Sequence, residues 1–383
     1  MQTIRMDLRT PWSEQLRAVR DRWLSNPVFR RRAAAFPLTR PIARRRAREL
    51  FDLCAGFVYS QVLLACTRLG LFDILAEGPQ TAEELARRTS LPEEAARQLL
   101  RAASSLRLVA RRSGDRFGLG DLGAAMVGNT AVAAMVEHHS LLYADLQDPV
   151  ALLRGEHKDT NLSRYWPYAG SELPARLKVE SVAGYTALMS ASQPLVAEEV
   201  LDAYPMERHR CLLDVGGGDG TFIAAAAERA PDLRLLLFDL PAVADRARLR
   251  FATAGLAQRA EAIGGDFLSD RLPRGADIAS LVRVIHDHDD GRALTILRAV
   301  RRALPPDGTL LLAEPMAGTP GAEPMGEAYF GFYLLAMGRG QPRSFKELTA
   351  LLAQAGFGGI RLLPNRMPLQ TRLVVARCLT ERS

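Results

Sequence analysis

The sequence predicts an α/β protein in which a mainly helical N-terminal domain precedes a domain built on a parallel sheet. Three observations support this prediction. Helix and hairpin patterns follow one another between residues 81 and 119, and strand-like and helical runs alternate from Arg210 onwards. A glycine-rich turn, Asp214 to Gly220, joins the first of those strands to a helix. Alternating strands and helices are typical of parallel sheets with helices on both faces.

The composition is that of a globular protein. The chain has 383 residues, 48% of them hydrophobic and 24% charged, which is enough for two domains. Its four cysteines form no CxxC pair, so we expect neither a disulfide framework nor a thiolate metal site, and a reducing compartment. The start lacks the apolar core of a signal peptide. The most apolar window, 53–66, contains a glutamine and is too short to span a bilayer, so no integral membrane segment is predicted.

Residues 1–49 are predicted to form a basic arm. Residues 1–50 contain 13 arginines and four acids, whereas the whole chain has a net charge of +7, so the body of the protein is close to neutral. Blocks such as Arg30-Arg31-Arg32 and Arg44-Arg45-Arg46 suit nucleic acid, an anionic membrane surface or an acidic partner. A solvated basic surface without a specific ligand is the plainer interpretation.

Residues 50–190 are predicted to form a helical, winged-helix domain. The run 50–75 is apolar and predicts a buried helix. A capping-box pattern, Thr81-Ala-Glu-Glu84, opens the next helix, and another begins near Glu93. Two short strands within 108–119 then form a predicted hairpin.

A winged helix serves either DNA binding or dimerisation. Glu93 and Glu94 stand at the N-terminal end of the second helix, where a recognition helix meets DNA and where phosphates would repel carboxylates. Arg97 and Arg101 follow on the same helix, so the repulsion is not absolute. We expect a dimerisation module and no nucleic-acid partner.

Residues 120–200 are expected to be mostly helical and contain a group of aromatic side chains. These suit either core and interface packing or the wall of a pocket for an apolar substrate, and both interpretations stay open. The group comprises Tyr143, Tyr165, Trp166, Tyr168 and Tyr185.

Residues 191–383 are predicted to form the sheet domain. Strands are expected at 211–215, 233–238, 278–285 and 309–313, with an edge strand at 371–376, and helices at 222–229, 291–304 and 345–355. In open α/β sheets, ligands bind at the carboxyl ends of the strands. Loops at those ends are therefore the first places to search for a site.

The glycine-rich loop differs from a dinucleotide fingerprint. Gly216 and Gly218 fit the first two glycines, but Thr221 stands where Gly or Ala should close the helix onto the strand. The carboxylates of Asp214 and Asp219 would repel a pyrophosphate and suit a ligand with an ammonium and a sulfonium group. The loop therefore predicts S-adenosylmethionine as cofactor.

Two further acids follow strand ends in the order that this cofactor requires. Asp239, followed by Leu240, lies 19 residues beyond Gly220, and its carboxylate can accept both hydroxyls of a ribose. Downstream, Asp266 and Phe267 suit the amino group and the face of an adenine. Three such elements in order are more specific than a glycine-rich loop alone.

The motif series "LLDVGGGDGTF", "FDLPAV", "GGDF", "VIHDHDD" and "LLLAEP" resembles the plant-type small-molecule O-methyltransferase family over residues 50–376. Two further stretches, "FPLTRPIARRRARELFDLCAGFVYSQVLLAC" and "DPVALLRGE", are similar to the purple-bacterial methyltransferases of acyclic carotenoids. The resemblance implies a winged-helix dimerisation domain, a Rossmann-like class I methyltransferase domain and a homodimer. It also implies O-methylation of a hydrophobic hydroxylated substrate in carotenoid biosynthesis and photosynthesis. The implied location is the cytoplasm, or the periphery of the inner photosynthetic membrane.

The resemblance also assigns site residues. It implies that His286 is the proton acceptor, that Glu314 orients it, and that the acids after the strands contact ribose and adenine. This chain departs from the family at His288, which replaces an aromatic residue, and at Val282, which replaces a lysine and leaves Arg283 as the nearby cation. No carboxylate stands near Gln341, where the family has a second orienting acid.

The run from His286 to Asp290 also has the residue types of a metal site. Asp289 and Asp290 instead suit the start of a helix, where acids favour the dipole, so no metal is predicted. Asp287 is expected to contact the substrate or cap that helix, and His288 to be structural. Four alternatives remain: polyketide or flavonoid O-methylation, bacteriochlorophyll C-methylation, a DNA-binding regulator, and a cofactor-binding scaffold without catalysis.

Overall fold

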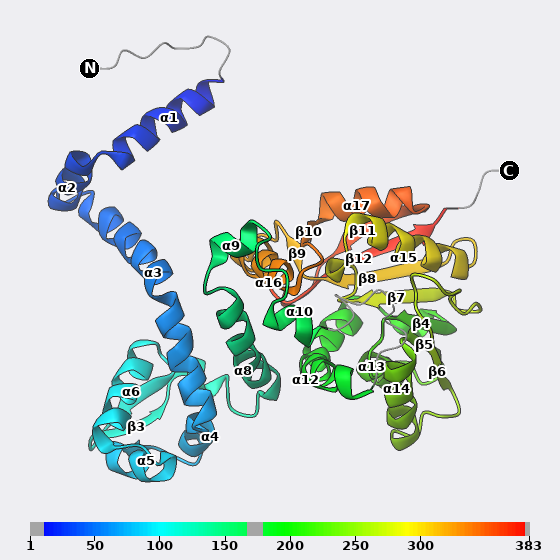
Figure 1. Ribbon diagram of the computed structural model, residues 1–383, viewed down its shortest axis with the longest axis horizontal. Helices are drawn as coiled ribbons and strands as arrows, with labels where there is room; N and C mark the ends of the chain where they lie inside the picture. Colours follow the sequence, from blue (N-terminus) through cyan, green and yellow to red (C-terminus); the bar gives the residue numbers. More distant parts are fainter. Residues whose placement is uncertain (1–10, 167–178, 380–383) are drawn as a thin grey trace. The chain divides into compact units, whose positions relative to one another are not determined.

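The computed structural model describes residues 11–166 and 179–379, with the side chains of 179–187 left outside the description. The chain divides into two compact units, Met1–Val127 and Gly128–Ser383 (Figure 1). The sequence placed its boundary between residues 190 and 191, on the basis of the cofactor motifs. Compactness and cofactor motifs divide a chain by different criteria, so that boundary stays a prediction.

The basic arm is helical where it is described. Helix α1 (Trp12–Ser25) is followed by α2 (Pro27–Ala35), whose N-cap Asn26 accepts hydrogen bonds from two backbone N–H groups. Helix α3 (Arg40–Arg68) then continues beyond the arm. It is separated from α4 (Leu71–Ala76) by Gly70, whose positive φ of 60° ends the helix.

The prediction of one buried helix at 50–75 is wrong. The run belongs to two helices, and only two residues of α3 are buried. Leu53 is 81% exposed and Phe57 66% exposed, because no other element in the described part of the chain covers that stretch of α3. By length and composition alone, α3 is the one helix among the described residues that could cross a membrane. The absence of an integral membrane segment stays a prediction.

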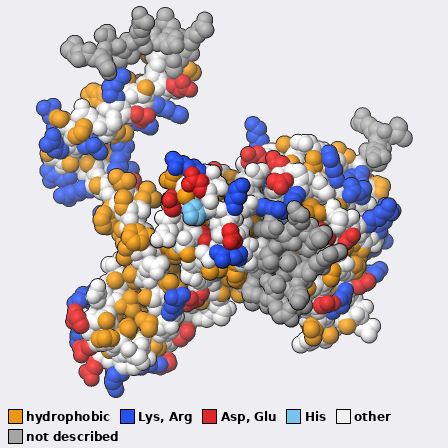
Figure 2. All heavy atoms as spheres, in the orientation of Figure 1, with side chains coloured by type: hydrophobic (Ala, Val, Ile, Leu, Met, Phe, Trp, Pro, Cys, Tyr) orange, Lys and Arg blue, Asp and Glu red, His pale blue; other side chains and the backbone are white. Residues whose placement is uncertain are grey.

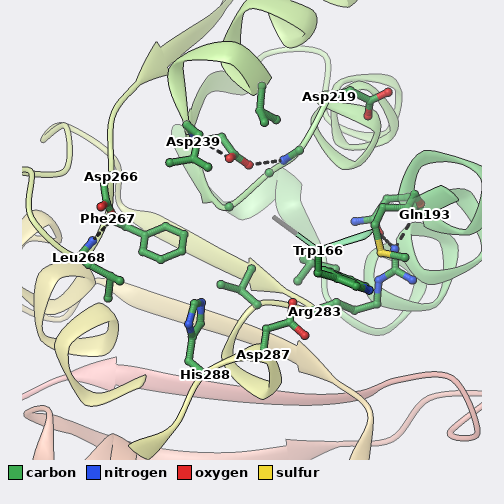
Figure 3. Close-up of a pocket in the computed structure, with 18 of the residues that line it drawn as sticks. Trp166, Gln193, Asp219, Asp239, Asp266, Phe267, Leu268, Arg283, Asp287 and His288 are labelled. Atoms are coloured by element: carbon green, nitrogen blue, oxygen red, sulfur yellow. Dashed lines mark hydrogen bonds between the residues drawn. The ribbon is translucent and has the colours of Figure 1, made fainter. Parts of the chain in front are cut away.

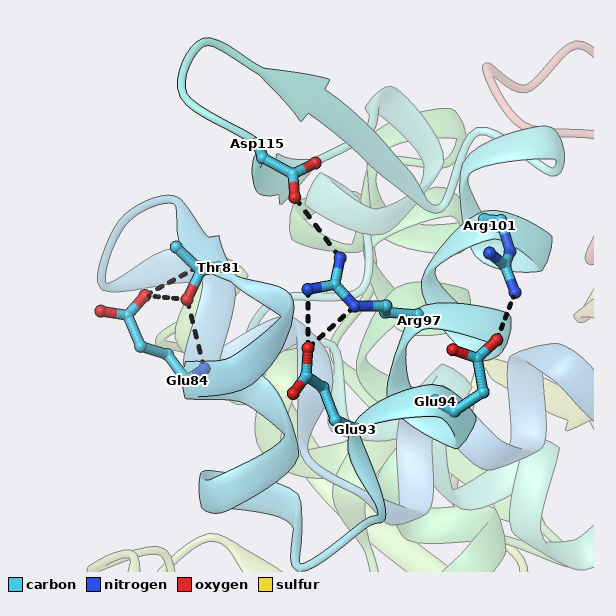
Figure 4. Close-up of polar contacts among 7 residues, drawn as sticks. All are labelled: Thr81, Glu84, Glu93, Glu94, Arg97, Arg101 and Asp115. Atoms are coloured by element: carbon cyan, nitrogen blue, oxygen red, sulfur yellow. Dashed lines mark hydrogen bonds and ion pairs between the residues drawn. The ribbon is translucent and has the colours of Figure 1, made fainter.

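The winged-helix pattern is confirmed. Helices α5 (Ala82–Thr89) and α6 (Glu93–Ser105) are followed by the hairpin of β2 (Val109–Arg112) and β3 (Arg116–Leu119). Strand β1 (Gln80–Thr81), which precedes α5, completes a three-stranded antiparallel sheet in the order β1-β3-β2. The predicted capping box forms at the start of α5. On α6, Arg97 pairs with Glu93 and Asp115, and Arg101 pairs with Glu94, so both arginines already face carboxylates (Figure 4).

Short helices lead from the first unit into the second. Helix α7 (Asp121–Ala124) closes the first unit, and α8 (Thr130–Asp145), α9 (Pro149–Leu153), α10 (Asn161–Tyr165) and α12 (Val179–Ala203) open the second. An apolar cluster joins α8, α9 and α10 to α16 (Phe330–Met337). The helical prediction for 120–200 is thus confirmed over the described part.

A seven-stranded sheet forms the centre of the second unit, with apolar clusters on both faces. Its order is β11-β12-β8-β7-β4-β5-β6, with β12 antiparallel to both of its neighbours and β8 to β6 parallel. The strands are β4 (Cys211–Val215), β5 (Arg234–Asp239), β6 (Ala260–Gly264), β7 (Ile278–Val282), β8 (Thr309–Glu314), β11 (Phe357–Leu363) and β12 (Arg372–Cys378). The connecting helices include α13 (Thr221–Arg229), α14 (Pro241–Thr253), α15 (Asp290–Ala303) and α17 (Phe345–Gln354).

Three details of the sheet differ from the prediction. Strand β7 ends at Val282, three residues early, because Arg283 has a positive φ of 58° and turns the chain into a short 3-10 helix, Ile285–Asp287. Strand β12 is not an edge strand, since β11 pairs with its outer side. The sequence also missed β6 and β11, whose apolar runs are interrupted by glutamate or glycine.

Candidate active site

A pocket lies at the carboxyl ends of β4, β5 and β7 (Figure 3). This is where parallel α/β sheets bind ligands. Of the eight predicted cofactor residues, all but Asp214 line it. The lining consists of Trp166, Met189, Ser190, Gln193, Gly216, Gly217, Gly218, Asp219, Asp239, Leu240, Val243, Asp266, Phe267, Leu268, Val282, Arg283, Val284, Asp287, His288, Arg292, Met337 and Arg339.

The glycine-rich loop forms one wall of the pocket. Gly216 has a φ of 72°, and a Cβ atom there would lie 2.8 Å from a methyl group of Val284. Gly218 has a φ of 61°, and its N–H donates a 2.8 Å hydrogen bond to Asp239. Positive φ is strained for residues with a side chain, so glycine at both positions brings bare backbone to the ligand.

Asp239 is held rigidly at the end of β5. Its Oδ2 atom accepts from Gly218 N–H, and its Oδ1 atom accepts from Leu240 N–H at 2.7 Å. Burial raises the pKa of Asp239 to about 6, although these two hydrogen bonds work in the opposite direction. Each oxygen keeps a second lone pair, so the carboxylate can still accept two hydroxyl groups.

Asp214 is the predicted cofactor residue that does not line the pocket. Its side chain lies beneath the loop, 1% exposed, and accepts a 2.6 Å hydrogen bond from Ser280 on β7. A Cβ atom on Gly217 would lie 2.5 Å from its Oδ2 atom. Asp214 therefore supports the loop from below, because its place inside β4 points it into the sheet. The sequence shows that an acid is present but not which way it points.

Asp266, Phe267 and His288 form the opposite end of the pocket. Asp266 accepts a hydrogen bond from Leu268 N–H at 2.9 Å. The rings of Phe267 and His288 lie 5.5 Å apart and nearly perpendicular. Burial lowers the pKa of His288 to about 4, so its ring is neutral at neutral pH, and its buried Nδ1 atom has no hydrogen-bond partner within the described residues.

The expectation that His288 only helps to begin a helix is therefore wrong. Its ring faces the pocket (Figure 3), whereas Asp289 caps α15 by accepting from Arg292 N–H at 3.0 Å. His288 and Asp289 differ in this way because β7 ends early and the 3-10 helix turns His288 toward Phe267. The helix-start prediction is confirmed for the two aspartates.

Arg283 lines the pocket and is the cation next to Val282, the position where the family has a lysine. Its guanidinium donates to Ser192 Oγ at 2.9 Å and to Gln193 Oε1 at 2.6 Å, both on α12. Its strained backbone directs the side chain out of the sheet and into the pocket (Figure 3). The neighbouring Val282 contributes an apolar side chain to the same wall.

His286 and Glu314 meet although they are 28 residues apart. His286 follows β7, Glu314 is the last residue of the adjacent parallel strand β8, and His286 Nδ1 lies 2.5 Å from Glu314 Oε2. The other oxygen of Glu314 accepts from the N–H groups of Val284 and Ile285, at 3.0 and 2.7 Å. The carboxylate therefore accepts a hydrogen bond from Nδ1–H, which keeps the proton on Nδ1 and leaves Nε2 as the basic nitrogen of a neutral ring.

Asp287 lies between His286 and the pocket. Its Oδ1 atom is 3.1 Å from His286 Nε2, as an ion pair without hydrogen-bond geometry, and Asp287 rather than His286 lines the pocket. Burial raises the pKa of Asp287 to about 6. Burial lowers the pKa of His286, but the charges of Asp287 and Glu314 outweigh it, so that pKa is raised overall.

Arg343 holds the turn that carries His286, a role that the sequence did not reveal. It is 3% exposed and donates to the carbonyls of Ile285 and His288 at 2.8 and 2.7 Å, and to Asp290 at 2.9 Å. Gln341 N–H donates to the carbonyl of His286 at 2.9 Å. Where the family pattern has a second acid, this chain thus has backbone contacts and a cation. The "GRGQPR" stretch gave no motif signal, because these contacts are made to carbonyl groups.

An aromatic wall adjoins this site. Trp166 lines the pocket and donates from Nε1 to the hydroxyl of Tyr333 at 3.0 Å. The same hydroxyl shares a 2.7 Å hydrogen bond with His138 Nε2, and burial lowers the pKa of His138 to about 4. The predicted Tyr168 and the side chain of Tyr185 lie outside the described residues. Over the described ranges, no group of three or more His, Cys, Asp or Glu side chains is arranged to hold a metal ion.

Comparison with known proteins matches this architecture. Residues 143–358 fit the model of the O-methyltransferase domain, and residues 51–136 fit that of the O-methyltransferase dimerisation domain. The chain belongs to the O-methyltransferase family. The match confirms the predicted fold class, the predicted cofactor S-adenosylmethionine and the expectation of a homodimer acting on a small molecule.

Several relatives cover nearly the whole chain. The demethylspheroidene O-methyltransferase of Cereibacter sphaeroides is 44% identical over 350 residues, 90% of each chain. That of Rhodobacter capsulatus is 38% identical over 345 residues, 89% of this chain and 84% of the relative. Among solved structures, the mitomycin 7-O-methyltransferase MmcR superposes with a TM-score of 0.72 at 27% identity, over 88% of this chain and 99% of the other.

The pocket fits S-adenosylmethionine by its charges. Four aspartates and three arginines line it, and this mixture of charges suits a ligand with an ammonium, a sulfonium and a carboxylate group. Asp239 retains acceptor capacity for a ribose diol. The bare glycine backbone would not tolerate side chains at Gly216 or Gly217.

Proposed function

We propose that this enzyme methylates the 1-hydroxyl group of acyclic hydroxycarotenoids, in reactions of the demethylspheroidene-to-spheroidene type. The observation that carries the proposal is the 44% identity, over 90% of both chains, to a demethylspheroidene O-methyltransferase. The apolar wall beside Asp287 is consistent with it, since Trp166, Met189 and Met337 can pack against a polyene, which makes no hydrogen bonds. O-methylation of a polyketide or flavonoid and C-methylation of bacteriochlorophyll are the alternatives.

Seven lining residues would hold the cofactor. Asp239 would accept the ribose hydroxyls, with Leu240 packing beside it, and Asp266 and Phe267 would contact the adenine. Gly216 and Gly218 would admit the cofactor to the backbone, and Arg283 would face its carboxylate end. Asp214 would act indirectly, by supporting the loop from below. Bound S-adenosylmethionine supplies an electrophilic methyl group in line with the attacking oxygen.

His286 would act as the proton acceptor. Glu314 fixes its tautomer, so Nε2 is the atom that can take the hydroxyl proton. An alcohol is far less acidic than imidazolium, so the proton must move as the oxygen attacks rather than beforehand. Asp287, 3.1 Å from Nε2, would first accept a hydrogen bond from the substrate hydroxyl group and then stabilise the protonated ring of His286. The two carboxylates together hold the positive charge that His286 acquires.

The test is a comparison of acceptors with the purified protein and labelled S-adenosylmethionine. Acyclic 1-hydroxycarotenoids, a flavonoid, a hydroxylated polyketide and a bacteriochlorophyll precursor would be offered in the same detergent. We expect kcat/KM for the hydroxycarotenoid to exceed that for every other acceptor by at least tenfold. A higher value for any of the others would overturn the substrate assignment.

We also propose that the basic arm brings the enzyme to an anionic membrane, where a long apolar substrate resides. Lys and Arg side chains gather over α2 and the start of α3 (Figure 2). Each basic residue near an anionic surface contributes about 1 kcal/mol at most. The test is co-sedimentation of the full chain with anionic vesicles. Replacing Arg30–Arg32 and Arg44–Arg46 by glutamine should abolish binding, while the same change at Arg271 and Arg274 should not.

The exposed part of α3 would meet the second subunit. Leu50, Phe51, Leu53 and Phe57 are all more than half exposed and fall within or next to the matched dimerisation domain. Apolar side chains of this size are seldom left in water on such a scale. A dimer would therefore cover the surface that a single chain leaves open.

A further inference from the structure

The first helix of the arm has an apolar face that none of the other described residues covers. Trp12, Leu16, Val19 and Trp23 of α1 are spaced by three or four residues, which places them in one row along the helix. Trp12 is 82% exposed and Trp23 58% exposed, and Leu16 and Val19 are also exposed. None of the residues of α1 is buried.

Charges are distributed around this face in a definite order. At about 100° per residue, Arg20 and Arg22 fall on its two flanks, whereas Glu14 and Asp21 fall on the opposite side of the helix. Arg20 also pairs with Asp21 at 2.8 Å, an exposed ion pair of the kind that contributes little and that lipid phosphates can replace. The apolar row thus has cations at its borders, with two acids and Arg17 behind it.

The second helix extends the same surface. Trp23 packs edge-on against Phe29 of α2, with ring centroids 5.2 Å apart. Helix α2 carries Arg30, Arg31 and Arg32, all exposed. Aromatic contact thus links the apolar row of α1 to the arginines of α2, which are visible as part of the blue region of the arm in Figure 2.

We propose that α1 lies in the headgroup region of an anionic lipid bilayer, with Trp12, Leu16, Val19 and Trp23 inserted among the lipids. Tryptophan is favoured at this depth because its ring is apolar and its N–H is polar. Flanking arginines extend their charged ends to lipid phosphates while their stems stay apolar. Amphipathic helices with this distribution lie in the plane of the interface.

The proposal deepens the membrane contact proposed above and rests on it. Charge alone would bring the arm to the surface and would fail at high salt, because salt screens exposed charges. Insertion adds a contribution that salt does not screen. The two are therefore separable by experiment.

Fluorescence offers a direct test, since the chain has three tryptophans and two of them lie on this face. The full-length protein would be mixed with vesicles of phosphatidylcholine and phosphatidylglycerol with brominated acyl chains. We expect a blue shift and strong quenching of the emission. In a Trp12→Phe, Trp23→Phe variant the remaining Trp166 is buried, so that variant should bind without either change.

Partitioning gives the second measurement. Trp12→Ala together with Trp23→Ala should weaken partitioning into anionic vesicles at least tenfold at moderate salt. Leu249→Ala, which removes a side chain that is 70% exposed on α14, should not.

Three results would overturn the proposal. Salt-sensitive binding that shows no blue shift and is not weakened by the two alanine substitutions would mean that the arm contacts the membrane by charge alone. Absence of binding to any vesicle would remove the membrane contact as well. A blue shift without lipid that grows with protein concentration would show that a second copy covers the row.

Discussion

Replacing Glu314 by glutamine tests the role of His286 with the smallest change in shape. Glu314 uses one oxygen to accept from two backbone N–H groups and the other to accept from His286 Nδ1. Glutamine has a single oxygen, which must serve the backbone groups, so its NH2 group faces Nδ1. Nδ1 can then only accept, and the proton moves to Nε2, the atom that should receive the substrate proton.

The expected loss is that of a general base. Such a group contributes about 10²- to 10⁴-fold to a rate, or about 2.7 to 5.4 kcal/mol of barrier at about 1.36 kcal/mol per tenfold. Because Glu314 does not line the pocket, cofactor affinity should change less than twofold. The assay is single-turnover methyl transfer at saturating cofactor, with calorimetric binding of S-adenosylmethionine alongside.

The matched control is Glu323→Gln, an exposed glutamate outside the site. It should leave both quantities unchanged. A Glu314→Gln enzyme that kept more than a tenth of the wild-type rate would refute the tautomer argument. An equal loss of cofactor affinity would instead indicate that the pocket itself had been disturbed.

Three further substitutions have defined outcomes. Asp287→Asn removes a negative charge that raises the pKa of His286. Because the neutral ring is the active form, the acid limb of the profile of kcat/KM against pH should move to lower pH. A shift of that limb to higher pH would contradict this. Gly216→Ala should weaken cofactor binding in calorimetry about tenfold, because φ is 72° there and the new Cβ atom would meet Val284. Gly255→Ala, at a φ of 68° but in open space, should leave cofactor binding unchanged. Equal effects of the two substitutions would refute the argument from the close contact. Arg343→Met should lower the free energy of unfolding by about 2–4 kcal/mol and reduce kcat more than cofactor affinity, and an unchanged kcat would remove its positioning role.

Much of the site could be predicted because its residues follow strands in a fixed order. The loop from Asp214 to Gly220, Asp239, and the pair Asp266 and Phe267 each lie at or just beyond the carboxyl end of a strand. The carboxyl ends of parallel strands gather at one edge, so sequence order alone brings these residues together. The meeting of His286 with Glu314 follows from the same rule, since β7 and β8 are neighbours.

The remaining features depend on directions and contacts that no local pattern encodes. Asp214 points into the sheet rather than into the pocket, and His288 turns into the pocket because β7 ends at Val282. Arg343 acts on carbonyl groups more than 50 residues away, which carry no side-chain signal. Leu53 has the apolarity of a core residue, yet it is 81% exposed.

The position of the transferred methyl group tests the central proposal most directly. The purified enzyme would be incubated with S-adenosylmethionine carrying a trideuterated methyl group and an acyclic 1-hydroxycarotenoid, and the product would be examined by mass spectrometry and NMR. The account predicts one trideuteromethyl group bonded to the oxygen at carbon 1, absent from the product of the His286→Ala enzyme. A label on carbon, or full labelling by the His286→Ala enzyme, would contradict it.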